Sequence, residues 1–75
     1  MSNRLMVICE YRGRTIDLLL PSDLRTDELL KILDEKFPRS AGKREYVRCS
    51  NPIAMLTGDQ PLSYFGLQDG STLIL

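Results

Sequence analysis

One stretch of this sequence, residues 24–37, has the period of an amphipathic helix, and stretches with the period of strands lie on both sides of it. The apolar residues of this stretch recur at i, i+3, i+4 and i+8, which places them on one helical face: Leu29, Ile32, Leu33 and Phe37. A single helix with such a stripe needs an apolar surface to pack on, and a sheet built from the flanking strands supplies one. The sequence therefore predicts an α+β fold with one helix across one face of a sheet.

The sequence also carries signals for the two ends of this helix. Asp27 and Glu28 lie in the first turn, where the helix dipole favours carboxylates, and Pro38 is expected to stop the helix. Both Asp23 and Thr26 have side chains suited to capping the N-terminus, and the sequence does not choose between them.

Two strands are expected before the helix. Residues 4–11 are rich in β-branched and apolar types, and residues 14–20 alternate between apolar and polar side chains. Arg12-Gly13 gives a tight connection between them, because glycine readily takes a positive φ. The sequence therefore predicts an antiparallel hairpin. Leu19 breaks the alternation and is expected to be either an exposed apolar residue or a contact point.

Three further strands are expected after the helix, at residues 46–50, 53–56 and 71–75, separated by turn-forming residues. The resulting order is β-β-α-β-β-β, in a mixed sheet of four to five strands. Because the helix supplies a right-handed crossover between the two halves, the first and last strands are expected to pair in parallel at the centre.

Size and charge exclude several classes of function. A chain of 75 residues has room for one core, so a single domain spanning residues 1–75 is expected. Ten basic and ten acidic residues give zero net charge, without the basic field that holds proteins on nucleic acid. The apolar run before Glu10 is too short for a signal peptide or a membrane span. We therefore expect a cytoplasmic protein with no nucleic-acid partner and no direct membrane insertion.

The two cysteines do not form a pattern typical of a reactive site. Cys9 and Cys49 stand alone in apolar stretches, without CxxC spacing, and the sequence contains no histidine. Two buried free thiols are expected, since free cysteine behaves as a small apolar residue. No metal, no cofactor and no enzymatic activity is predicted.

The last third of the chain resembles ubiquitin-like domains. In the run from Leu62 to Leu75, a Leu-Ser pair, an aromatic residue and an apolar residue precede a turn and a final Thr-Leu-x-Leu strand. The hairpin around Gly13 and the segment Pro21-Ser22-Asp23 before the helix are similar to that superfamily as well. The resemblance covers almost the whole chain and implies a ubiquitin-like β-grasp fold.

Within that superfamily the sequence resembles the YukD/EsaB family of bacterial type VII secretion systems. Three features carry this likeness: the spacing from Val47-Arg48 through Asn51 to Leu56-Thr57-Gly58, the run from Leu62-Ser63 to Gly66-Leu67, and the finish Asp69-Gly70 then Leu73-Ile74-Leu75. The family implies a soluble cytoplasmic accessory protein that supports or regulates export by a membrane-embedded machine. Its partner is then expected to be a membrane-associated secretion component.

Two other functions are compatible with the same fold. Modifiers and sulfur carriers of this fold end in a flexible Gly-Gly tail, whereas this sequence ends at Leu75 within the expected last strand. A modifier or carrier whose tail lies outside the given sequence is one alternative, and a stop codon directly after the codon for Leu75 would eliminate it. A ubiquitin-like domain excised from a larger membrane protein is the other.

The alternation of the hairpin also predicts a binding surface. If Met6 and Ile8 point toward the helix together with Ile16 and Leu18, the other apolar residues of the first strand lie on the helix-free face. That face is then predicted to bind a protein through Leu5, Val7, Cys9, Tyr11, Arg48 and Ile74, with a basic rim of Arg4, Arg12 and Arg14. Ubiquitin uses this same sheet face for most of its contacts.

Two points about this surface stay open at the level of sequence. High β-propensity alone also explains an apolar strand, with arginine stems covering its exposed side. A second basic cluster, Arg39, Lys43 and Arg44, follows the helix and is expected to be solvated surface. The sequence leaves the oligomeric state undecided, a homo-oligomer included.

Overall fold

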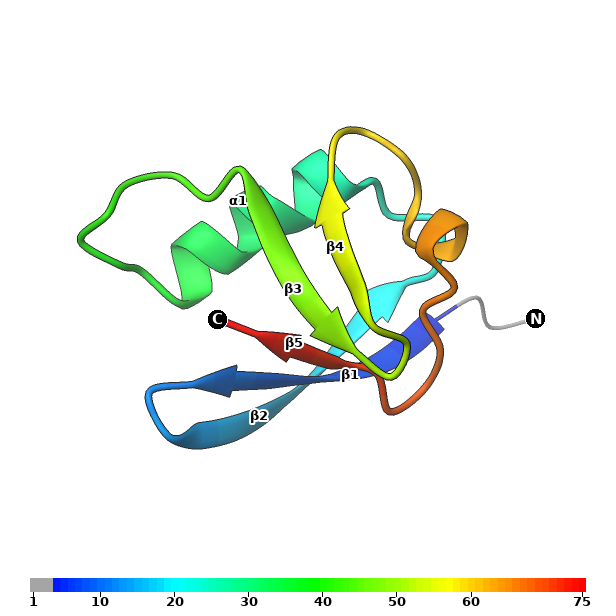
Figure 1. Cartoon of the computed structure of the whole chain (residues 1–75), viewed down its shortest axis with the longest axis horizontal. Helices are drawn as coiled ribbons and strands as arrows, with labels where there is room; N and C mark the ends of the chain where they lie inside the picture. The colour runs from blue at the N-terminus through cyan, green and yellow to red at the C-terminus, as the bar shows by residue number, and fades with distance from the viewer. Residues whose placement is uncertain (1–3) are drawn as a thin grey trace.

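The fold is known from a computed structural model that describes residues 4–75, and Figure 1 shows the path of the chain. The expected order of helix and strands is confirmed, with one added 3-10 helix, η1. The elements are β1 (Arg4–Tyr11), β2 (Arg14–Pro21), α1 (Thr26–Lys36), β3 (Tyr46–Ser50), β4 (Ala54–Thr57), η1 (Leu62–Phe65) and β5 (Thr72–Ile74). Residues 1–3 of the expected domain lie outside the described residues.

The strands form one five-stranded mixed sheet with the order β2-β1-β5-β3-β4. The expected parallel pairing of the first and last strands is confirmed, since Ile8 of β1 lies beside Thr72 of β5. The hairpin is confirmed as well: Arg12 and Gly13 both take positive φ, 51° and 78°, as a two-residue turn between twisted strands requires. Tyr11 therefore pairs with Arg14 directly behind the turn.

The helix begins at Thr26, one residue after its N-cap, Arg25. Neither of the two expected caps is used. The backbone N–H of Arg25 donates to the Glu28 carboxylate at 3.2 Å. The Thr26 hydroxyl donates to the backbone carbonyl of Gln60 at 2.7 Å, and this bond ties the start of α1 to the segment before η1. The helix ends at Lys36, so Pro38 follows its last turn as predicted.

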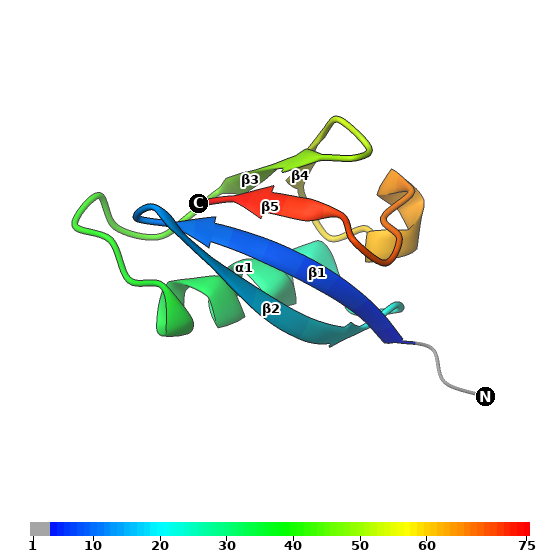
Figure 2. The same ribbon diagram turned by 90° about the horizontal axis from the view of Figure 1, so that it is seen from below.

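The core lies between α1 and one face of the sheet, and Figure 2 shows the helix running along that face. Leu29 and Leu33 of α1 are fully buried, as are the side chains of Val7, Cys9 and Leu73 from the central strands. Burying one such aliphatic side chain stabilises a fold by about 1.5–3 kcal/mol. Because a single helix covers a single face, the opposite face of the sheet remains open among the described residues.

The predicted orientation of β1 is wrong. Val7 and Cys9 were expected on the helix-free face, but both are 0% exposed and belong to the core. Leu5 and Tyr11 also lie on the helix side, partly buried against that core. The reason is the register of the hairpin, which pairs Val7 with Leu18 and so places both on the face that packs on α1.

Two smaller differences concern the ends of strands. The strand expected at residues 53–56 is displaced by one residue, to Ala54–Thr57, and Ile53 lies in the turn before it with 93% of its surface exposed. The last strand is shorter than expected, Thr72–Ile74, and Ser71 before it is buried, with its hydroxyl donating to the carbonyl of Asn51 at 2.7 Å.

The orientation of β1 can be tested with the same charge at two adjacent positions. Val7→Lys puts an ammonium group into the closed core and is expected to cost more than about 4 kcal/mol, enough to unfold so small a domain. Met6→Lys is expected to change the free energy of unfolding by about 1 kcal/mol or less, because Met6 is 39% exposed on the open face. Thermal melts followed by circular dichroism show which of the two variants still folds. A folded Val7→Lys together with an unfolded Met6→Lys would reverse the assignment of the faces.

Candidate protein-binding surface

The face of the sheet opposite α1 carries a row of apolar side chains, which we call the open-face stripe. It consists of Met6, Ile8, Leu19, Tyr46, Met55 and Ile74. All of these except the half-buried Ile8 are between 39% and 56% exposed. Of these residues, the sequence predicts Ile74 as a binding residue and leaves Leu19 open between an exposed apolar residue and a contact point.

The register of the sheet brings these side chains together. Met6 is the cross-strand partner of Leu19, and Ile8 follows Met6 on the same face of β1. On the other half of the sheet, Arg48 lies between Ile74 and Met55 as the partner of both. Directly paired residues have Cβ atoms about 5 Å apart, so the stripe crosses the sheet from β2 to β4.

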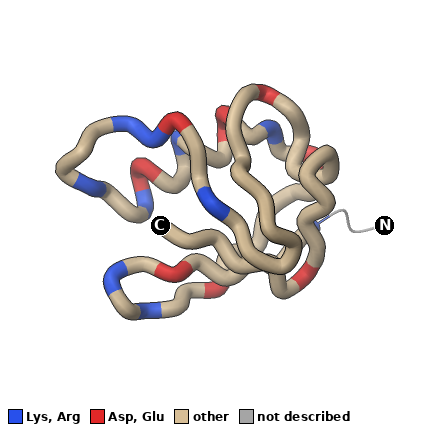
Figure 3. The backbone as a smooth tube through the Cα atoms, in the orientation of Figure 1, with Lys and Arg blue, Asp and Glu red and all other residues tan. Residues whose placement is uncertain are grey.

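The charged groups on this face are few and mixed. Arg48 is exposed within the stripe, and Arg4 lies on the same face at the start of β1. Glu10 pairs with Ile74, and Asp17 pairs with Ile8, so two carboxylates flank the apolar row. Figure 3 shows further basic residues away from this row, among them those at the hairpin tip and in the loop after α1.

Of the residues predicted to bind, the structure therefore brings Arg48 and Ile74 together on the open face, with Arg4 at its margin. It places Leu5, Val7, Cys9 and Tyr11 on the opposite side. Arg12 lies in the hairpin turn and Arg14 on the helix side of β2, so neither borders the open-face stripe.

Tyr11 has a structural role on the helix side. Its ring packs on Phe37 with 5.1 Å between the ring centroids, and its hydroxyl donates to the backbone carbonyl of Pro38. The guanidinium carbon of Arg12 lies 5.2 Å from the centroid of the same ring, within the range of a cation–π contact. These contacts hold the hairpin tip against the C-terminal end of α1.

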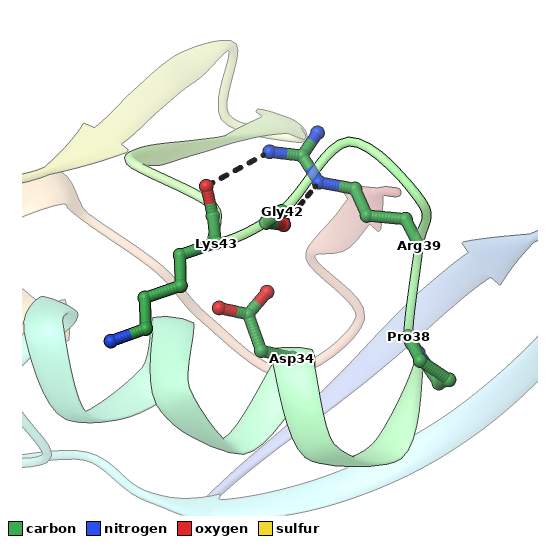
Figure 4. Close-up of a pocket in the computed structure, with 5 residues that line it drawn as sticks. All are labelled: Asp34, Pro38, Arg39, Gly42 and Lys43. Carbon is green, nitrogen blue, oxygen red and sulfur yellow. Dashed lines mark hydrogen bonds between the residues drawn. The ribbon is translucent and has the colours of Figure 1, made fainter.

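The loop after α1 is ordered by its own arginines. Figure 4 shows Arg39 bonded across the loop, donating to the carbonyls of Gly42 and Lys43, each at 3.3 Å. Asp34 of α1 faces the same hollow, a pocket of about 230 Å³.

Arg44 is not solvated surface, contrary to expectation. It is only 7% exposed, and its guanidinium donates to the carbonyls of Leu33 and Phe37 at 3.2 and 2.7 Å. The same group forms an ion pair with Asp34 at 2.8 Å. The last carbonyls of a helix lack partners within the helix, so Arg44 completes the C-terminal end of α1.

The two cysteines flank the same residue in the sheet. Leu73 of β5 is the cross-strand partner of both Cys9 and Cys49, so two strand spacings, about 9–10 Å, separate the cysteines. A disulfide needs Cα atoms within about 7 Å, and both thiols are free and buried, as predicted. Burial, with a smaller effect from Asp17, raises the pKa of the Cys9 thiol from 9.0 to about 11. Burial also raises the pKa of Cys49.

Within residues 4–75 no helix is long and apolar enough to cross a membrane. In the same part of the chain, no three His, Cys, Asp or Glu residues come together in a way that could hold a metal ion.

Comparison with known proteins identifies the fold. No protein-family model and no curated protein sequence matches this chain. Among solved structures, the solution NMR structure of the ubiquitin-like domain of an Arabidopsis thaliana protein is similar with a TM-score of 0.71. The two sequences are 10% identical, and the match covers 96% of this chain and 74% of that one.

A second similar structure is a protein designed de novo on the basis of ubiquitin. Its TM-score is 0.69 at 21% identity, over 99% of this chain and 88% of the designed one. The chain therefore has the predicted ubiquitin-like β-grasp fold, in its α+β form with one helix on a five-stranded mixed sheet. At these identities the similarity describes the fold alone.

The role of Arg44 can be measured against its neighbour. Arg44→Ala removes the ion pair with Asp34 and the hydrogen bonds from the guanidinium to the carbonyls of Leu33 and Phe37, and is expected to lower the free energy of unfolding by about 3 kcal/mol. Lys43→Ala removes an exposed side chain and is expected to change it by about 0.5 kcal/mol or less. Chemical denaturation of both variants gives the two values. Equal effects would show that Arg44 does not hold the end of α1.

The raised pKa of Cys9 predicts a loss of stability at alkaline pH. Below pH 9 the thiol keeps its proton in both states; between pH 9 and about 11 the unfolded chain releases this proton and the native chain does not. The wild type is therefore expected to lose about 2 kcal/mol more than Cys9→Ala between about pH 8 and about pH 10.5. Denaturation curves of the wild type and of Cys9→Ala at both pH values measure this difference. Equal losses of unfolding free energy in the wild type and in Cys9→Ala would contradict the raised pKa of Cys9.

Proposed function

We propose that this chain is a protein-binding module that docks its partner on the open-face stripe and performs no catalysis. The observation that carries the proposal is the exposure of five large apolar side chains, 39–56% each, in register on one sheet face. Solvent-exposed apolar side chains that lie next to one another usually mark an interaction site. A domain of this size has few apolar residues to spare from its core.

The composition of the stripe fits a protein partner. The stripe contains Tyr46 and two methionines, residue types that are enriched in the centres of protein interfaces, and an exposed arginine, Arg48, lies beside Ile74 and Met55 on the same face. An arginine in such a place binds a partner's carboxylate with two parallel hydrogen bonds. The proposed partner therefore presents an apolar surface with a carboxylate that meets Arg48.

We further propose that the partner is a membrane-associated component of a bacterial type VII secretion system, and that this chain is its cytoplasmic accessory protein. The sequence resemblance to the YukD/EsaB family supports this part of the proposal. It rests on three features: the spacing from Val47-Arg48 through Asn51 to Leu56-Thr57-Gly58, the run from Leu62-Ser63 to Gly66-Leu67, and the final Asp69-Gly70 and Leu73-Ile74-Leu75.

The proposal is tested by affinity capture from cells that encode such a secretion system, followed by mass spectrometry. Ile74→Lys changes an exposed residue of the stripe and Arg48→Glu changes its exposed cross-strand partner, and both are expected to reduce capture of the secretion component at least about tenfold. Tyr64→Lys changes a side chain of η1 that is 67% exposed and lies outside the stripe, and it is expected to bind as the wild type does.

Thermal melts keep this test specific, because all three variants should melt within a few degrees of the wild type. Undiminished capture by both Ile74→Lys and Arg48→Glu would contradict docking on the open face. A stripe-dependent partner that is unrelated to secretion would leave the docking surface in place and contradict the secretion role.

A further inference from the structure

The outer edge of the sheet at β2 is a second surface, separate from the open-face stripe. β2 is eight residues long, and it is bonded to β1 on one side only. Figure 2 shows β2 at the margin of the sheet, beside α1 and with no strand beyond it in the described residues. An edge strand of this length presents a row of backbone donors and acceptors.

The bonds of β1 reveal which backbone groups of β2 point outward. Toward β5, Met6 accepts from Gly70, Ile8 donates to Ser71, and Glu10 accepts from Leu75, at 2.8–2.9 Å. The alternate residues of β1 therefore bond to β2, and their partners there are Arg14, Ile16, Leu18 and Leu20. It follows that the N–H and C=O groups of Thr15, Asp17 and Leu19 face away from the sheet.

This outward row lacks most of the features that usually protect an edge. Neither lysine nor proline occupies its three positions, and the only proline of β2 is its last residue. The carbonyl of Pro21 already accepts from the N–H of Leu24 at 3.2 Å, so the unpaired row ends there. Three donors and three acceptors match a partner strand of about five residues.

A groove of about 450 Å³ lies beside this edge, on the helix side of β2. It is lined by Tyr11, Arg12, Arg14, Ile16, Lys36 and Phe37. Ile16 belongs to the helix-facing side of β2 and is nevertheless 41% exposed, because the side chains of α1 do not cover it. The groove thus combines aromatic and aliphatic walls with three cations, and none of its lining residues carries a carboxylate.

We propose that the β2 edge and this groove bind an extended acidic peptide segment of another protein by strand addition. The segment pairs its backbone with Thr15, Asp17 and Leu19. Its alternate apolar side chains lie against Ile16 and Phe37. Its carboxylates lie at the hairpin end, where three cations line the groove.

Two arguments select this occupant. Only another polypeptide strand matches the alternating donors and acceptors of the edge, which excludes a nucleic acid or a lipid surface from this role. A second copy of this chain fits poorly, because full antiparallel overlap of two β2 edges pairs Thr15 with Leu19 and sets Asp17 opposite Asp17. Like charges in directly opposite positions destabilise strand pairing.

The test uses a synthetic peptide of the sequence Val-Thr-Val-Thr-Val joined to three aspartates, made with the acidic end first and with the acidic end last. These two versions cover both strand directions. In a titration of the 15N-labelled protein, at least one is expected to bind saturably with a Kd below about 1 mM. Amide shifts and slowed hydrogen exchange are expected at Thr15, Asp17 and Leu19.

Matched controls separate strand addition from simple charge attraction. N-methylation of alternate peptide amides on the paired side is expected to abolish binding, and replacing the aspartates by lysines should weaken it at least about tenfold. Lys36→Glu should also weaken binding, whereas Lys31→Glu, a change at an exposed position of the same helix outside the groove, should matter much less. Asp17→Pro removes one outward N–H and should reduce binding relative to Asp17→Ala.

Three results would overturn the proposal: no saturable binding of either peptide, equal binding of the N-methylated peptide, or shifts confined to Met55 and Ile74 on the open face. The N-methylated peptide acts on the unaltered protein. The test therefore stays decisive even if Asp17→Pro fails to fold.

Discussion

The packing of one helix on one face of the sheet is the constraint on which the rest of the structure depends. Leu29 and Leu33 fill the space above Val7, Cys9 and Leu73, and this contact uses the only α-helix among residues 4–75. The part of the chain that the structure describes has no second layer with which to cover the opposite face. The exposed side chains of Met6, Ile74 and their neighbours, and hence the proposed binding surface, follow from this arrangement.

Much of the architecture could be predicted from the sequence, because each element carries a local signal. The helical period, the Arg12-Gly13 turn and the parallel central pair were all predicted correctly. The orientation of β1 was not, since this strand has apolar residues on both faces. The turn contains the information that decides this orientation. A two-residue turn pairs Tyr11 with Arg14, and the same register pairs Val7 with Leu18, so these two side chains lie on one face of the sheet.

Other parts of the structure depend on contacts between distant residues and have no local signal. Arg44 stands in a polar loop, and it is buried only because Asp34 and the final carbonyls of α1 lie within reach. The prediction of the N-terminal cap of α1 was wrong for a related reason. The Thr26 hydroxyl donates to the backbone carbonyl of Gln60, 34 residues away, and does not cap the helix. The groove at β2 could not be predicted from a local pattern either, because its lining residues come from both the hairpin and the C-terminal end of α1.

The central claim is that Val7 and Leu73 lie under the helix whereas Met6, Met55 and Ile74 face solvent. Paramagnetic relaxation of methyl signals by a soluble gadolinium chelate measures this directly, one side chain at a time. The account predicts strong relaxation at the methyl groups of Met6, Met55 and Ile74, and weak relaxation at those of Val7 and Leu73. Strong relaxation at Val7 and Leu73 with protection of the other three would contradict it.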